Sequence, residues 1–230
     1  MRILPALFVA LALSGAALAF QQQEPAVKTA QVADPKADEA KVIAQQLPSY
    51  PLTECPISHE HLDAMGKPLD VVQDGRLVRL CCKGCLKKFK AEPATVFAAI
   101  DKGVIEAQKA SYPMEKCPVS GEALGGMGEP KDMVYGTRLV RLCCPSCEKG
   151  FAKEPAKFMA QVDAALIAKQ KPSYPLKTCM VSGETIGADG VDHLYGTRLT
   201  RFCCDKCVVA FDKEPAKYLA QLDKAAPQKN

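Results

Sequence analysis

The chain has 230 residues, a formal net charge of +4 and a sequence pI near 8.4. Its basic and acidic side chains are interleaved and form no basic stripe, which argues against a nucleic acid partner. The sequence also has no carboxylate pair, no Ser-His-Asp order and no phosphate-cradling glycine loop, so we expect no enzymatic activity.

The N-terminus has the pattern of an export signal. One early arginine precedes an apolar run that ends in Ala17-Leu18-Ala19, the small-residue pattern that a signal peptidase accepts. An uncleaved membrane anchor is the alternative, but the polar QQQEP that follows favours cleavage after Ala19. We therefore expect residues 1–19 to be removed, the mature protein to be periplasmic or secreted, and no stable membrane insertion after cleavage.

Residues 20–48 are rich in Gln, Ala, Pro and charged side chains and are expected to form a flexible tether. A short helix is possible within 39–48, because EAKVIAQQLP matches in register the end of a helix expected later in the chain.

The rest of the chain repeats one unit three times. Ser-Tyr-Pro recurs at Ser49, Ser111 and Ser173, each time 62 residues further on. This spacing defines three expected modules at 49–110, 111–172 and 173–226, followed by a tail at 227–230. Each module holds one leading cysteine, an adjacent cysteine pair and a last cysteine three residues after that pair. The cysteines are Cys55, Cys81, Cys82 and Cys85; Cys117, Cys143, Cys144 and Cys147; and Cys179, Cys203, Cys204 and Cys207.

The second copy shows which elements to expect in each module. The turn residues of CPVSG at 117–121 predict a tight knuckle. A β-hairpin is expected with strands at 133–135 and 138–142 and its turn at Gly136-Thr137. A short helix is expected over 146–153. Phe151 in this helix, like Phe89 and Phe211 in the other copies, is expected to be a core residue beneath the cysteines. A longer helix should begin at Pro155 and continue to Lys169. The fold class is therefore small α+β modules in tandem.

A unit of about 60 residues is marginal on its apolar core alone, so its cysteines are the expected staple. A structural zinc contributes about 10 to 16 kcal/mol and a disulfide about 2 to 5, and either would suffice. Spacing favours metal. Cys143 and Cys147 share one side of a helical turn, and Cys144 and Cys147 form Cys-x-x-Cys at a helix N-terminus, where thiolate is favoured.

The combined pattern resembles the TRASH and YHS metal-binding modules. The shared features are Cys-Pro-Val-Ser-Gly in the second copy, with CPIS and CMVS at the same place in the other two, and in all three copies the hairpin leading into Cys-Cys-x-x-Cys-x-x-x-Phe and then Glu-Pro-Ala, over 49–226. The resemblance implies treble-clef-like units that serve in heavy-metal sensing, transport or trafficking, with metal ions as ligands and another exported or membrane metal-handling protein as partner. It places the metal ligands at the leading cysteine and at the Cys-x-x-x-Cys pair, such as Cys81 and Cys85. Cys82, Cys144 and Cys204 are additional, because YHS modules often have serine there.

Three or four thiolates select one soft or borderline ion per module: zinc, copper or another thiophilic metal. Permanent disulfides remain the alternative, because they are common outside the cytoplasm. The leading cysteine would then pair with one member of the adjacent pair, and the other would close Cys-x-x-Cys. A redox enzyme is the third possibility. We expect His59, His61 and His193 to be ordinary histidines, and Arg79, Arg141 and Arg201 either to stabilise the thiolates or to cover a solvated strand face.

Overall fold

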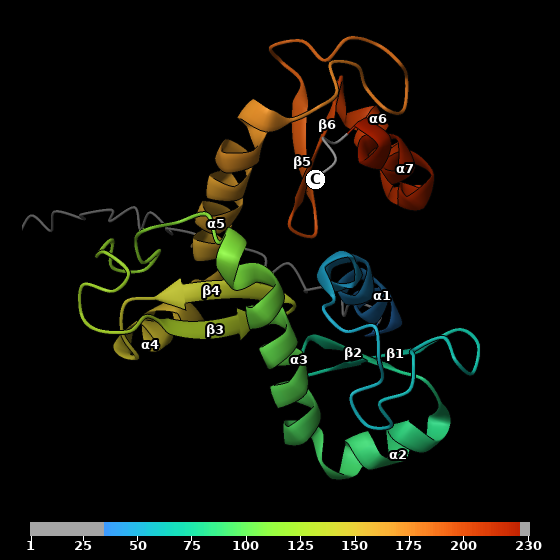
Figure 1. The fold of residues 1–230 in the computed structure, drawn as a ribbon, viewed down its shortest axis with the longest axis vertical. Coiled ribbons are helices and arrows are strands. Elements are labelled where there is room, and N and C mark those ends of the chain that lie inside the picture. Colours follow the sequence, from blue (N-terminus) through green and yellow to red (C-terminus); the bar gives the residue numbers. More distant parts are fainter. Residues whose placement is uncertain (1–34, 226–230) are drawn as a thin grey trace, which may run out of the picture. The chain divides into compact units, whose positions relative to one another are not determined.

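The computed structural model describes residues 35–225. The predicted signal sequence at 1–19, most of the predicted tether and the tail at 227–230 lie outside this range. The described chain is a small α+β protein with seven α-helices and three two-stranded hairpins, and each hairpin is followed by helices (Figure 1). No helix within this range is both long and apolar enough to span a bilayer.

The same series of elements occurs three times. Ahead of the first copy lie α1 (Pro35–Gln46) and the 3₁₀ turn η1 (Leu47–Ser49). The first copy contains β1 (Leu69–Gln73), β2 (Arg76–Leu80), α2 (Lys83–Ala91), α3 (Pro93–Gln108) and η2 (Lys109–Ser111). The second contains β3 (Lys131–Tyr135), β4 (Arg138–Leu142), α4 (Ser146–Lys153), α5 (Pro155–Gln170) and η3 (Lys171–Ser173). The third contains β5 (Val191–Tyr195), β6 (Arg198–Phe202), α6 (Asp205–Lys213) and α7 (Pro215–Ala225).

The predicted hairpins are present and antiparallel. In the second copy Lys131 lies opposite Leu142 and Tyr135 lies opposite Arg138, so Gly136 and Thr137 form a two-residue turn. Gly136 has a φ of 62°, the positive value that the first central residue of a type II′ turn requires. The second strand of each hairpin has buried side chains and ends directly before the adjacent cysteine pair.

The predicted short and long helices of the second copy are also confirmed, at 146–153 and 155–170. Proline starts each long helix, where its fixed φ fits and its missing N–H has no helical partner to lose. Phe89, Phe151 and Phe211 are each at most 1% exposed, which confirms them as core residues beneath the cysteines.

A glutamine at the end of a helix joins that helix to the hairpin that follows it. The Gln108 side-chain amide of α3 donates to the Thr137 carbonyl at 2.8 Å, and its Oε1 accepts the Leu139 N–H at 2.9 Å. Gln46 and Gln170 make the same pair of bonds at the other two hairpins. These bonds satisfy buried backbone groups at the turn, and they place each cysteine pair at a fixed end of its hairpin.

Candidate metal centres

Each leading cysteine lies in a closed turn. The Cys55 N–H donates to the Glu60 carbonyl at 2.8 Å, and the Cys55 carbonyl accepts the His59 N–H at 2.9 Å. His59 has a φ of 61° at the position where the other copies have Gly121 and Gly183, also at positive φ. The turn is the predicted knuckle, and it aims one sulfur at the end of the hairpin.

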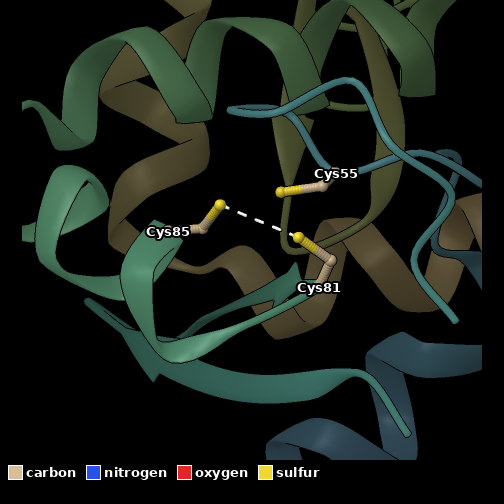
Figure 2. Close-up of side chains that lie close together, drawn as sticks. All are labelled: Cys55, Cys81 and Cys85. Atoms are coloured by element: carbon tan, nitrogen blue, oxygen red, sulfur yellow. Dashed lines mark hydrogen bonds between the residues drawn. The ribbon is translucent and has the colours of Figure 1, made fainter. Parts of the chain in front are cut away.

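The other two sulfurs of the centre come from the transition between strand and helix. Cys81 directly follows β2, and Cys85 lies in the first turn of α2. Their Sγ atoms are 3.7 Å apart, and with the Sγ of Cys55 they form a group whose members all lie within 4.8 Å of one another. Figure 2 shows the three sulfurs pointing toward a common centre.

The second and third copies repeat this arrangement. The Sγ–Sγ separations are 3.7 Å for Cys143–Cys147 and 3.6 Å for Cys203–Cys207. Cys117 and Cys179 complete these two groups within the same limit of 4.8 Å. Three thiol groups in the described chain are thus positioned to bind a metal ion, as the spacing of the cysteines predicts.

The second cysteine of each adjacent pair is not a member of these three-sulfur groups but lies at their edge. We call it the fourth cysteine: Cys82, Cys144 and Cys204. The Sγ of Cys144 is 3.8 Å from that of Cys143 and 3.7 Å from that of Cys147. Two thiolates bound to one tetrahedral zinc at about 2.3 Å each are about 3.8 Å apart. The triangle formed by Cys143, Cys144 and Cys147 therefore has the dimensions of one face of a tetrahedral thiolate site. Cys82 and Cys204 lie 3.8 Å from Cys85 and Cys207 in the same way.

Burial distinguishes the fourth cysteine from the others. Cys55, Cys81 and Cys85 are buried, whereas Cys82 is only partly so. The same difference separates Cys144 from the buried thiols of the second copy, and Cys204 is exposed. The described cysteines are all free thiols, at separations well beyond the 2.05 Å of a disulfide.

A serine in each knuckle contacts the centre, and the sequence had given it no role. The Ser58 hydroxyl lies 3.3 Å from the Sγ of Cys81 and also accepts the N–H of Glu60. Ser120 and Ser182 lie 3.3 Å from Cys143 and Cys203. The recurrence of this serine in all three copies was the signal that could have revealed it.

The knuckle environment favours a thiolate at the leading cysteine. Burial raises the pKa of Cys55, but hydrogen bonds from the Ser58 hydroxyl and from backbone N–H groups of Cys81, Ser58 and Ile57 outweigh it. The resulting pKa is about 6. Cys179 also reaches about 6, and Cys117 about 7, because the same kinds of donor outweigh burial there.

The pKa of the cysteine in each short helix is shifted in the opposite direction. Burial, followed by the adjacent sulfurs of Cys81 and Cys55, raises the pKa of Cys85 to about 12. The pKa of Cys147 and of Cys207 is raised to about 12 for the same reasons. Several thiolates in one small volume repel one another, and a bound cation removes that repulsion. A metal ion that bound at one of these groups would therefore have to displace protons from its thiols.

The arginines before the cysteine pairs are paired within the hairpin. The Nε of Arg79 donates to Asp70 at 2.8 Å, and its backbone N–H donates to the Tyr50 hydroxyl at 3.2 Å. Arg141 and Arg201 repeat both bonds, with Asp132 and Asp192 as their carboxylates. The guanidinium charge is thus balanced by an aspartate on the partner strand.

The histidines belong to none of the three thiol groups. His61 is exposed and contacts Asp63, and His59 is exposed on the knuckle. His193 packs against Phe202 and Phe211, and its Nε2 lies 3.2 Å from Asp212.

No family model, curated protein or solved structure matches this chain.

Proposed function

We propose that this protein is an exported, non-enzymatic metal-binding protein, in which each module holds one soft or borderline metal ion. The observation that carries the proposal is the threefold recurrence of a thiol group with corresponding members, in which every cysteine except Cys203 is buried. In each group burial and the neighbouring sulfurs raise the pKa of the helix cysteine when no cation is present, and a bound ion would remove that repulsion between thiolates.

Zinc is one ion that this spacing suits. The Sγ–Sγ separations of 3.6 and 3.7 Å within the Cys-x-x-x-Cys pairs are close to the edge of about 3.8 Å in a tetrahedral zinc–thiolate site. Copper(I) and other thiophilic ions accept the same ligands. The fourth cysteine would complete four-thiolate coordination, with the knuckle and the helix N-terminus holding the ion in a treble-clef-like manner.

The role that follows is sequestration or handling of a thiophilic metal, in line with the chain's resemblance to TRASH and YHS modules. The export signal predicted at residues 1–19 places this role in the periplasm or outside the cell. A partner in metal handling would be another exported or membrane protein, and no nucleic acid is involved.

Counting metals and thiols tests the proposal. The mature chain, purified from its native compartment, should carry about three ions by elemental analysis, and its twelve cysteines should become titratable after unfolding with a chelator. Cys55→Ser, Cys117→Ser and Cys179→Ser should each lower the count by one ion. Met65→Leu, an exposed change outside the thiol groups, should leave three.

The opposite result would identify the alternative. A chain with no metal and no titratable thiol would be a disulfide-stapled interaction scaffold, and the metal proposal would be wrong. Reduction followed by zinc titration would then show whether the thiol groups can be loaded at all.

A further inference from the structure

The third thiol group is more open than the other two. In the first and second copies the first member of the adjacent pair is buried, with Cys81 6% and Cys143 2% exposed. In the third copy Cys203 is only partly buried, and its neighbour Cys204 is exposed. One edge of this group, formed by two adjacent sulfurs 3.8 Å apart, therefore faces solvent.

The same copy has the shorter connection between knuckle and hairpin. In the first two copies 25 residues separate the leading cysteine from the pair, whereas 23 separate Cys179 from Cys203. The shortened loop closes tightly at Gly190, where an added Cβ would lie 2.4 Å from the Ile186 side chain and 3.1 Å from the Phe202 carbonyl. Less chain is available beside the third group than beside the others.

The helix beside this edge also differs. Val209 of α6 is 59% exposed, and it occupies the position of Lys87 in α2 and Lys149 in α4. An apolar side chain thus replaces a cation within two helical turns of the exposed cysteines. No lysine ammonium therefore lies at this position of the helix beside the exposed cysteines.

We propose that the third module is the exchange site of the protein, where external sulfur donors enter to remove or deliver the metal. This inference rests on the proposed function. A thiol approaching the open edge forms a metal–sulfur bond as the bond to Cys204 breaks. The incoming thiol gives its proton, through water, to the departing Cys204 sulfur, and the metal keeps its oxidation state. In the first and second groups the first sulfur of the adjacent pair is buried and the second, that of Cys82 or Cys144, is only partly exposed, which leaves less room for such an attack.

Thiol-driven release from the full, zinc-loaded chain tests this proposal. Reduced glutathione serves as the sulfur donor, and 4-(2-pyridylazo)resorcinol reports released zinc. One of the three equivalents should leave about tenfold faster than the others, which corresponds to a barrier lower by about 1.4 kcal/mol. Its rate should rise with glutathione concentration. Cys179→Ser should abolish this fast phase, whereas the matched variant Cys117→Ser should keep it and lose a slow one.

A second measurement needs no variant. After one equivalent has left, alkylation with N-ethylmaleimide and peptide mapping should label Cys203 and Cys204 before the thiols of the other modules. A single rate for all three equivalents, or first labelling at the first or second module, overturns the inference while leaving the proposed function intact. A chain that takes up neither zinc nor another thiophilic metal overturns both.

Discussion

Metal affinity should depend steeply on pH, because the thiol groups hold protons that a metal must displace. With a pKa of about 12, Cys85 keeps its proton throughout the range from pH 8 to pH 5 in the metal-free chain. Binding releases that proton, so this thiol alone weakens binding tenfold for each unit of pH lost, or about 1,000-fold over the range.

The knuckle cysteine adds a second step. With a pKa of about 6, Cys55 is a thiolate at pH 8 and mostly protonated at pH 5, which weakens binding by about another tenfold. Together these two ligands predict a loss of at least about 10⁴ in affinity, equivalent to about 5 kcal/mol. The other ligands can only add to this loss wherever they also release protons.

Equilibrium competition against a chelator of known proton affinity measures this dependence. The logarithm of affinity should rise by at least one unit per pH unit, and the slope should become steeper below about pH 6 or 7, where the knuckle thiolates take up protons. Ser120→Ala removes one hydrogen bond that lowers the pKa of Cys117, so the change of slope for that site should move to higher pH. A slope well below one unit throughout would mean that protons are not displaced, and the thiol assignment would be refuted.

Three further outcomes follow from the fold. Phe151→Ala should lower the free energy of unfolding by about 3 to 5 kcal/mol in chemical denaturation, because it empties a buried ring site, while Tyr135→Ala at a more exposed ring should cost less. Gln170→Ala leaves the Leu199 N–H and Thr197 carbonyl unpaired and should lower the free energy of unfolding by about 2 to 4 kcal/mol. A loss below about 0.5 kcal/mol would contradict the role of this glutamine in joining helix and hairpin. His61→Ala should leave three ions per chain by elemental analysis, since this exposed side chain belongs to none of the thiol groups, and a count of two would make it a ligand.

The features that sequence reasoning predicted depend on short stretches of chain. Gly136 marks the hairpin turn, Pro155 marks the start of a helix, and the four-residue spacing of Cys143 and Cys147 places two sulfurs on one side of a turn. Because the unit is repeated, each of these assignments then applied to all three copies. The knuckle cysteine was assigned to its group because turn residues surround it and because the resemblance to TRASH and YHS modules places a ligand there.

The features that it missed depend on partners far apart in the chain. Gln108 and Leu139 are 31 residues apart, and Arg141 and the Tyr112 hydroxyl are 29 apart. No local pattern pairs such residues before the helix and hairpin are packed together. The accessibility of each sulfur was also beyond reach, because it depends on how the intervening loop closes over the site.

Repeated ligands with unequal surroundings have a physical consequence for a metal-handling protein. Equilibrium affinity depends mainly on the number and type of the ligands, and these are alike in the three groups. The rate of ligand exchange depends in addition on whether an incoming donor can reach the ion, and the exposed edge at Cys203 and Cys204 provides that access. A chain built in this way can bind three ions with similar strength and still exchange one of them quickly. The two buried groups would then stabilise the fold while the third passes its metal on.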